Sequence, residues 1–268
     1  MIEPGEEPVA LITPADLRTY VINLPRRPDR RAWMARTLPP DLPVTFTSDW
    51  TGPFDGHELT RNKLEVAGYK LFPWKIESDN PWWSRPLKYG EIGCTLAHLA
   101  CWRHAAQAGD DRFIVILEDD AILASTFLDD LLAGLRRVVP ASPFDLLYLG
   151  RYPLEPEHDQ PAVASFVSPA YSHCTFGYLL TRPALDLLLA THLEHAVVPI
   201  DEFLPSLYIY HPRPDLRARF PRQLTALAFD PPLVRQHPKD EAGSDTEDSD
   251  FVEPWPEDQL TNQGIGRF

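Results

Sequence analysis

Three consecutive acids, Glu118, Asp119 and Asp120, directly follow the most apolar run of the chain, residues 113–117. Open α/β sheets bind their ligands at the carboxyl ends of strands, so these acids stand where chemistry is expected. Side chains two apart on an extended strand point the same way, which predicts Glu118 and Asp120 on one face and Asp119 on the other. Two carboxylates on one face suit a hard cation such as Mg²⁺ or Mn²⁺ that bridges to phosphates. The alternative is a solvated strand end that caps the next helix.

Several common catalytic fingerprints are missing from the sequence. It contains no G-x-G-x-x-G, no G-x-x-x-x-G-K-[ST], no H-E-x-x-H and no G-x-S-x-G. Dinucleotide-dependent dehydrogenases, P-loop enzymes, zinc proteases and α/β-hydrolases therefore lose their usual sequence support. A metal-assisted transfer from a nucleotide-sugar donor remains compatible with the acidic triplet.

Strands and helices alternate along the chain and must position these acids. The patterns predict strands over residues 18–24, 43–47, 112–117, 144–149 and 175–181, and helices over 29–38, 91–108, 127–138 and 183–190. Residues 56–68 have helical content, and residues 69–89 are expected to form a long loop. Its Trp74, Trp82 and Trp83 could close as a lid, although burial in the core is the commoner fate of tryptophan. This alternation predicts a single α/β domain, residues 18–238, with a mainly parallel central sheet.

The last part of the chain differs in composition. Residues 239–258 contain nine acidic side chains and one lysine. We therefore expect residues 239–268 to form an acidic tail, either partly disordered or closing over the site.

Charge and composition exclude several classes of protein. With 25 basic and 39 acidic residues among 268, the net charge of −14 argues against a nucleic-acid partner. No apolar run approaches the ~20 residues of a membrane span, and the amino terminus lacks the pattern of a signal peptide. Three cysteines, 94, 101 and 174, do not suggest a disulfide framework, so we expect a cytoplasmic protein.

Six blocks of sequence carry a family resemblance. They are YVINLPRRPDRR at 20–31, GEIGCTLAH at 90–98, VILEDD at 115–120, FDLLYLGR at 144–151, PIDEFLP at 199–205, and His237 followed by GSDTE at 243–247. In this order they resemble glycosyltransferase family 25, which includes bacterial lipooligosaccharide and procollagen galactosyltransferases. The later blocks are most similar to the collagen branch. Ala97 departs from the pattern, in which serine more often precedes the histidine.

The resemblance implies a GT-A-like, Rossmann-like fold and an inverting transfer from a UDP-sugar, usually UDP-galactose, to a hydroxyl. It also implies a divalent metal, usually Mn²⁺ with Mg²⁺ as the alternative, and an acceptor that is a glycan or bears hydroxylysine. A cation held by carboxylates would draw off the charge on a departing diphosphate, which agrees with the acidic triplet. The competing hypothesis is a non-catalytic sugar- or partner-binding module on the same fold.

Roles for individual residues follow from that resemblance. Asp120 and Glu118 are the expected metal ligands, joined by His237, whose alternative is an ordinary surface residue. The acceptor hydroxyl needs a base, for which Asp201 is preferred over Glu202, although both acids could instead cap a helix.

A further group of residues is expected around the donor. The guanidinium groups of Arg26 and Arg30 are expected to bind phosphate oxygens of the donor. Arg27 is expected only to lie in solvent at the surface. Glu91 and His98 lie seven apart and share a helical face, so they line the donor pocket or His98 is simply buried. Cys94 and Cys101, on the same helix, are expected in the core. The donor-binding set is Asn23, Arg26, Arg30, Glu91, His98, Glu118 and Asp119.

Overall fold

The computed structural model describes residues 11–253, and within them eight strands form one central sheet. Its order is β2 (Val44–Phe46), β1 (Leu17–Ile22), β3 (Phe113–Glu118), β8 (Ser172–Thr181), β5 (Leu146–Pro153), β9 (Ala226–Phe229), β7 (Phe166–Ser168) and β6 (Gln160–Pro161). A second, two-stranded sheet pairs β10 (Val234–Gln236) with β4 (Ala121–Leu123).

The direction of the strands makes the central sheet mixed but mainly parallel. β1 runs parallel to β2 and β3, and β5 runs parallel to β9. β8 runs against both of its neighbours, β3 and β5. Since β5 and β8 are joined without an intervening α-helix, the crossover that parallel neighbours need is missing between them. The predicted α/β fold with a mainly parallel sheet is confirmed.

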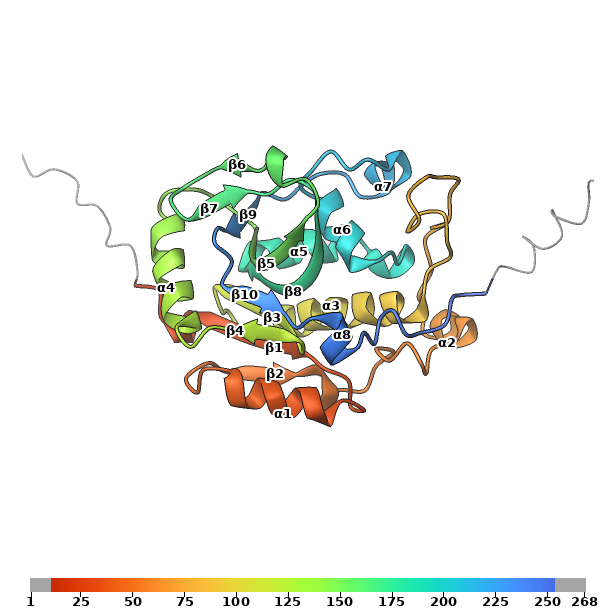
Figure 1. The fold of residues 1–268 in the computed structure, drawn as a ribbon, viewed down its shortest axis with the longest axis horizontal. Coiled ribbons are helices and arrows are strands. Elements are labelled where there is room, and N and C mark those ends of the chain that lie inside the picture. The colour runs from red at the N-terminus through yellow and green to blue at the C-terminus, as the bar shows by residue number, and fades with distance from the viewer. Residues whose placement is uncertain (1–10, 254–268) are drawn as a thin grey trace, which may run out of the picture.

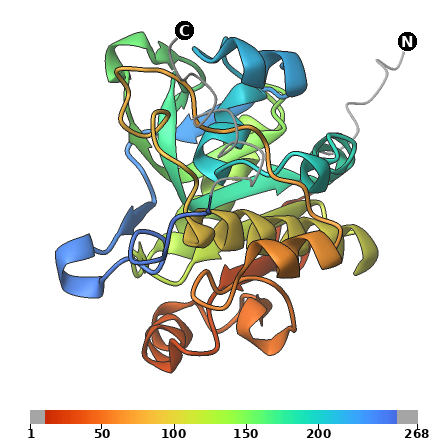
Figure 2. The same ribbon diagram turned by 90° about the vertical axis from the view of Figure 1, so that its right-hand side faces the viewer.

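Helices cover both faces of the sheet (Figures 1 and 2). They are α1 (Pro28–Thr37), α2 (Arg61–Val66), α3 (Tyr89–Gln107), α4 (Phe127–Val138), α5 (Arg182–Leu189), α6 (Ile200–Ser206), α7 (Pro214–Arg219) and α8 (Lys239–Ala242). The side chains of β3 alternate between two cores. Ile114 and Ile116 pack with α3, α5 and α6, whereas Val115 and Leu117 pack with α1 and α4.

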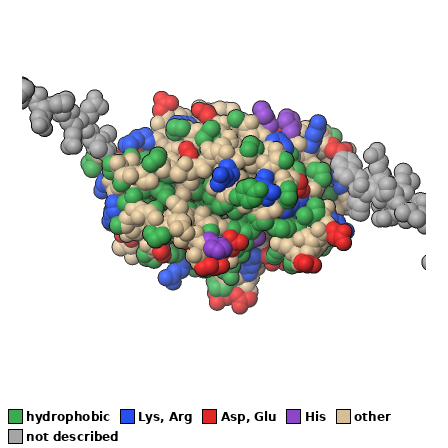
Figure 3. Space-filling view, turned by 90° about the horizontal axis from the view of Figure 1, so that it is seen from above, with side chains coloured by type: hydrophobic (Ala, Val, Ile, Leu, Met, Phe, Trp, Pro, Cys, Tyr) green, Lys and Arg blue, Asp and Glu red, His purple; other side chains and the backbone are tan. Residues whose placement is uncertain are grey.

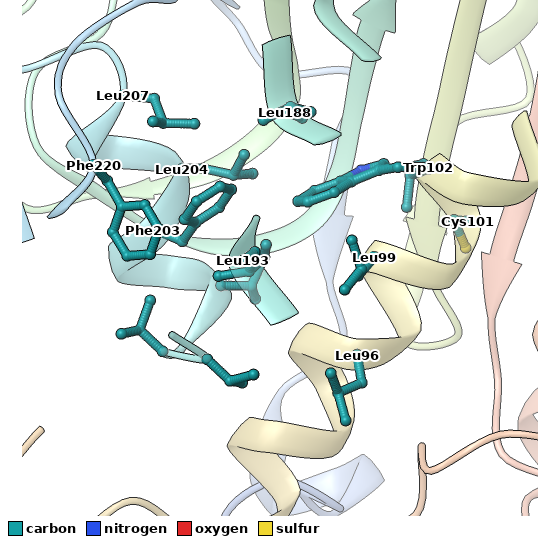
Figure 4. Packing of buried hydrophobic residues seen from close by; sticks show 14 of the residues in the cluster. Leu96, Leu99, Cys101, Trp102, Leu188, Leu193, Phe203, Leu204, Leu207 and Phe220 are labelled. Carbon is teal, nitrogen blue, oxygen red and sulfur yellow. The ribbon is translucent and has the colours of Figure 1, made fainter. Parts of the chain in front are cut away.

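Helix α3 supplies the centre of the larger core. Figure 4 shows Trp102 of α3 and Phe203 of α6 pointing toward each other, with Leu99 and Leu188 beside them. The rings of Trp102 and Phe203 lie 5.9 Å apart. This packing fixes the start of α6, which carries two of the predicted site residues, against α3.

Most predicted elements lie where the sequence places them. The helix predicted over 127–138 is observed over Phe127–Val138, and the long helix α3 ends at Gln107, just before Gly109, whose φ is +146°. In the segment 56–68 only Arg61–Val66 is helical. Strands β4 and β10 have no counterpart among the predicted elements.

The beginning of the acidic tail returns to the body of the protein. After α8, in blue in Figures 1 and 2, residues 243–252 run along the start of α3. The backbone of Tyr89 donates to Asp250 O, and Val252 N donates to Leu87 O. The predicted tail beyond residue 253 lies outside the described residues.

Candidate functional site

A cavity of about 230 Å³ lies at one edge of the central sheet. The carboxyl ends of β1 and β3 meet there, and β8 begins at the same edge because it runs in the opposite direction. The cavity is lined by Asn23, Arg30, Glu91, Cys94, residues 118–120, residues 173–175, Asp201, Glu202, Gln236, Lys239 and residues 243–247, among others. Most of the predicted site residues therefore share one cavity.

The acidic triplet departs from strand geometry. Asp119 was predicted to point away from Glu118 and Asp120, but all three side chains line the cavity. Strand β3 ends at Glu118, and Asp119 and Asp120 form a turn, so the alternation of faces stops there. Asp119 accepts hydrogen bonds from Asn23 Nδ2 at 2.7 Å and Arg30 Nη1 at 2.8 Å.

These carboxylates carry more negative charge than their surroundings neutralise. Burial and the charges of Glu118 and Asp119 raise the pKa of Asp120 to about 7. Burial also raises the pKa of Glu118 and of Asp119, with Arg30 acting in the opposite direction on both. Such crowding is relieved by protons or by a cation.

Three buried oxygens in the cavity have no hydrogen-bond partner among the described residues. They are Asp120 Oδ1, Asn23 Oδ1 and Asp201 Oδ1. Buried acceptors are normally paired, so each invites a ligand atom. Asp120 Oδ1, amid the surplus of negative charge, fits a divalent cation that prefers oxygen ligands. Asn23 Oδ1 fits a hydroxyl or N–H group.

Asp201 and Glu202 stand in the first turn of α6 but have opposite environments. Glu202 is 3% exposed and accepts from Trp83 Nε1 at 3.0 Å, Tyr171 OH at 2.7 Å and His211 Nε2 at 2.8 Å. Although burial opposes it, His173, whose Nε2 lies 3.4 Å from Oε1, and His211 lower the pKa of Glu202 to about 2.

The carboxyl group of Asp201 is poorly supported by comparison. Burial, reinforced by the charge of Glu118, raises the pKa of Asp201 to about 6. The amide of Cys174 opposes that rise. Cys174 has φ +66°, a strained conformation for a residue with a side chain, and such strain clusters at functional sites. Asp201 is thus the acid of this pair that is free to take a proton.

The arginines after β1 are bound by an acid from the far end of the chain. Asp245 pairs with Arg26 at 2.5 Å and with Arg27 at 2.7 Å, and lies 3.6 Å from Arg30. Arg30 lines the cavity, whereas Arg26 lies outside its lining and also pairs with Asp55 at 2.6 Å. Arg27, predicted only to solvate the surface, holds Asp29 and Asp245.

Close packing at Gly90 keeps the segment 243–252 in place. Gly90 N donates to Ser249 Oγ at 2.7 Å, and a Cβ atom at Gly90 would lie 2.6 Å from Thr246 O. Lys88 Nζ also donates to the carbonyl of Glu247. Only glycine permits this approach, and it makes residues 243–247 one wall of the cavity.

The predicted donor-binding residues of α3 take different positions. Glu91 lines the cavity but is bound by Arg85 and by the backbone of Lys88. His98 is fully buried behind the cavity, with its Nε2 3.5 Å from Glu118 Oε1. Cys94 is partly buried against the larger core and also lines the cavity, whereas Cys101 is fully buried in that core.

His237 does not bring its ring to the acids. The ring packs edge-on against Trp33, with centroids 4.9 Å apart, and His237 is not among the lining residues. Its backbone N donates to Asp120 O at 2.9 Å, so His237 supports the triplet through the main chain. Metal ligation by His237 stays a prediction and would require the ring to turn.

The three tryptophans of the loop 69–89 lie close to the cavity. Trp74 is buried and Trp82 is 44% exposed, and both line the cavity. Trp83 is held by its bond to Glu202. Arg213, 1% exposed, stacks on Trp74 at 4.4 Å and secures the loop from behind. Movement of this loop as a lid stays a prediction.

Sequence reasoning missed several lining residues. Gln236 donates to Asp120 Oδ2 at 3.1 Å, and Thr175 donates to Glu118 Oε1 at 2.7 Å. Lys239 and His173 also line the cavity. They come from β10, β8 and α8, and no motif marks them. The signal available for Gln236 and Lys239 was their position beside His237, in a block that the family resemblance had already singled out.

The fold and the cavity define an α/β protein with a candidate ligand site at the carboxyl ends of β1 and β3. Residues 16–152, just over half of the chain, match the model of "Glycosyltransferase family 25 (LPS biosynthesis protein)". The chain belongs to glycosyltransferase family 25, as the six sequence blocks predicted.

Relatives within the family carry different descriptions. Over 248 residues the chain is 33% identical to "Probable inactive glycosyltransferase 25 family member 3" of Bos taurus, covering 89% of this chain and 40% of that protein. It is 34% identical over 221 residues to procollagen galactosyltransferase 1 of Danio rerio, covering 80% and 35%. It is 32% identical over 221 residues to procollagen galactosyltransferase 2 of Homo sapiens, covering 80% and 34%. The chain therefore spans 40% or less of these relatives' length.

Among the residues 11–253, no helix combines the length and apolar character needed to cross a membrane. On the face seen in Figure 3, hydrophobic, acidic and basic side chains of the described residues are interspersed.

Proposed function

We propose that this chain transfers a sugar, galactose before others, from a UDP-sugar to an acceptor hydroxyl with inversion, assisted by Mn²⁺ or Mg²⁺. The observation that carries the proposal is the crowding of Glu118, Asp119 and Asp120 in one cavity, with Asp120 Oδ1 buried and unpaired. Membership of the family and the two relatives described as procollagen galactosyltransferases support the transferase reaction and the choice of galactose.

The donor would lie across the carboxyl ends of β1 and β3. Asp120 and Glu118 would hold the cation, which supplies neutralisation of the charge that develops on departing UDP. Arg30 offers its guanidinium group to the diphosphate. Asn23 Oδ1 offers an acceptor to a hydroxyl or N–H of the nucleotide.

Asp201 is the proposed base. The acceptor hydroxyl gives its proton to the Asp201 carboxylate while its oxygen attacks the anomeric carbon. The bond from that carbon to the UDP oxygen breaks, and UDP leaves with the bonding electrons. A pKa of about 6 leaves Asp201 ionised at neutral pH yet basic enough to accept the proton.

A hydroxylysine-bearing peptide is favoured over a glycan because two relatives are described as acting on procollagen. The exposed ring of Trp82 at the cavity offers a surface on which either acceptor can pack.

Release of UDP from a panel of UDP-sugars tests the proposal. The assay contains Mn²⁺, Mg²⁺ or EDTA, and a hydroxylysine peptide or a galactose-terminated glycan as acceptor. We expect the greatest UDP release with UDP-galactose and Mn²⁺, and its loss in EDTA and in Asp120→Asn. Equal turnover in EDTA would refute metal assistance, and turnover by the variant would refute the role of Asp120.

A non-catalytic binding module is the second candidate, because the bovine relative is described as probably inactive. That module would bind the UDP-sugar without releasing UDP. A ligand at 100 times its dissociation constant stabilises a protein by about 2.7 kcal/mol. A rise in Tm with UDP-galactose and Mn²⁺, together with no UDP release from any donor, would favour this second function.

A further inference from the structure

A chain of buried hydrogen bonds runs from the core to Glu118. Trp102 Nε1 lies 3.0 Å from Tyr178 OH, which lies 2.8 Å from His98 Nδ1. His98 Nε2 lies 3.4 Å from Thr175 Oγ1, which lies 2.7 Å from Glu118 Oε1. Trp102, Tyr178 and His98 are fully buried and Thr175 is 3% exposed, so water does not compete for these bonds.

The donor and acceptor roles along this chain have one consistent direction. The indole of Trp102 can only donate, so Tyr178 OH accepts from it and offers its own proton to His98 Nδ1. A buried hydroxyl needs an acceptor, and Nδ1 is the acceptor that Tyr178 OH reaches, so the imidazole carries a single proton. With Nδ1 as acceptor, that proton sits on Nε2, which donates to Thr175 Oγ1. The hydroxyl of Thr175 then donates to Glu118 Oε1.

The opposite tautomer of His98 would place two lone pairs against each other. In that tautomer Nε2 has no hydrogen, and its lone pair would face Glu118 Oε1 at 3.5 Å. It would also face Thr175 Oγ1, whose hydrogen is donated to Glu118. Both His98 and Thr175 therefore present hydrogens toward one edge of the carboxylate. The stacked ring of Tyr178, 5.5 Å from the imidazole and tilted by 25°, prevents the ring from turning away.

We propose that His98 is a positioning residue whose Nε2–H, with Thr175, orients Glu118 as an acceptor facing the cavity, and that Trp102 and Tyr178 select this tautomer. The inference rests on the proposed function, because Glu118 is oriented there for the cation of the transfer reaction. Bonds behind a metal-binding carboxylate fix its rotamer, and losing one typically weakens metal binding by about 10–100-fold.

The same geometry argues against an alternative use of His98. One ligand atom each of Cys94, His98 and Glu118 lie within 4.8 Å of one another, a spacing that would suit a soft metal. In the assigned tautomer Nε2 carries a hydrogen and Nδ1 is bound to Tyr178, so His98 has no free lone pair for a metal.

The tautomer can be read directly from the imidazole nitrogens. In ¹⁵N-labelled protein without metal or nucleotide, we expect the His98 signals, identified by their loss in His98→Gln, to show a protonated Nε2 and an unprotonated Nδ1. Tyr178→Phe removes one of the contacts that favour this tautomer, so a minor form protonated on Nδ1 should appear beside the main one. A proton on Nδ1 in the wild type overturns the proposal, whether or not the protein is a transferase.

Matched variants test the orientation of Glu118 through Mn²⁺ affinity, measured from the electron paramagnetic resonance of free Mn²⁺ in the presence of UDP. Glutamine places an amide N–H near Nε2, and asparagine places its amide near Nδ1. We expect His98→Gln and Thr175→Ser to keep the affinity within about threefold, and His98→Asn and Thr175→Val to lose about 10–100-fold. A thermal melt of each variant confirms that it is folded.

The two proposals fail differently. If the wild type binds no Mn²⁺, metal assistance is refuted. The ¹⁵N spectrum still shows which nitrogen of His98 carries the proton, and hence the direction of the hydrogen bonds. If the wild type binds Mn²⁺ and His98→Asn and Thr175→Val bind it equally well, the positioning role is overturned. Tight Zn²⁺ binding that is lost in both Cys94→Ser and His98→Gln would assign these residues to a metal site and also overturn it.

Discussion

Substituting the neighbours Asp201 and Glu202 should change stability in opposite directions. Burial raises the pKa of Asp201 from 3.8 to about 6. Because the folded protein holds the ionised form poorly, this shift costs on the order of 2–3 kcal/mol at pH 7. Asp201→Asn removes the charge at nearly constant volume. We expect a gain of about 2 kcal/mol, which raises the Tm of a chain of this size by roughly 4–8 °C.

Glu202→Gln should have the opposite effect. The pKa of Glu202 falls from 4.5 to about 2, which corresponds to roughly 3 kcal/mol of stabilisation at pH 7. Gln turns an amide toward Tyr171, His211 or Trp83, all of which donate to Glu202. Loss of one partner of a buried ionic hydrogen bond costs about 3 kcal/mol or more, and we expect Tm to fall by roughly 6–12 °C.

The pH dependence separates the two causes. The penalty at Asp201 is absent below about pH 4 and grows as pH rises through about 6. The advantage of Asp201→Asn over the wild type should therefore vanish near pH 4. The stabilisation at Glu202 is present above about pH 4.5 and is lost as pH falls toward 2, so the deficit of Glu202→Gln should shrink there.

The assay measures stability by thermal and urea unfolding without metal or nucleotide. It then measures the rate of sugar transfer in a single turnover. Asp201→Asn should lower the rate of transfer by about 10²–10⁴-fold while raising Tm. Glu202→Gln should lower Tm while keeping most of the rate at temperatures where it is folded. A destabilised Asp201→Asn, or one that retains wild-type transfer, would show that the assignment of the base is wrong.

Three further substitutions test other parts of the site. Asp120→Asn should abolish Mn²⁺ binding in a titration without lowering Tm, because its Oδ1 has no protein partner to lose; a large fall in Tm would contradict this. Asp245→Asn keeps the shape of the side chain but removes a charge that competes with a diphosphate for Arg30, so calorimetry should show UDP binding tightened about fivefold, or ~1 kcal/mol. Weaker binding would instead make Asp245 part of the donor site. Gly90→Ala should push away Thr246 and lower the free energy of unfolding by about 1–3 kcal/mol, with faster hydrogen exchange over residues 244–250; unchanged exchange would refute the packing argument.

Sequence patterns predicted elements well wherever one face is strongly apolar. Helix α4 was placed at its observed bounds because Phe127, Leu131 and Leu135 repeat every four residues and are all buried. Strands β4, β6, β7, β9 and β10 were not predicted; each has two to four residues, a length at which alternation is weak evidence. The direction of β8 was also out of reach, since it depends on how the chain returns rather than on the residues of the strand.

The site was predictable as a set of residues but not as a set of environments. The sequence offered both Asp201 and Glu202 as the base, with Asp201 preferred, and only the fold brings His211 and Tyr171 to Glu202. Asp119 was assigned to the wrong face because the alternation rule was extended past the end of its strand. The ring of His237 depends on its packing against Trp33, which is more than two hundred residues away in sequence.

Residues 243–247 form one wall of the cavity but belong to neither sheet. Strand β10 ends at Gln236, and the exposed stretch 239–241 separates it from that wall. A single proteolytic cut in this stretch would leave every strand of both sheets covalently joined, while the segment that carries Asp245 would be held only by its contacts with residues 87–90 and with the arginines that follow β1. Folding and ligand recognition would then be separable at one peptide bond.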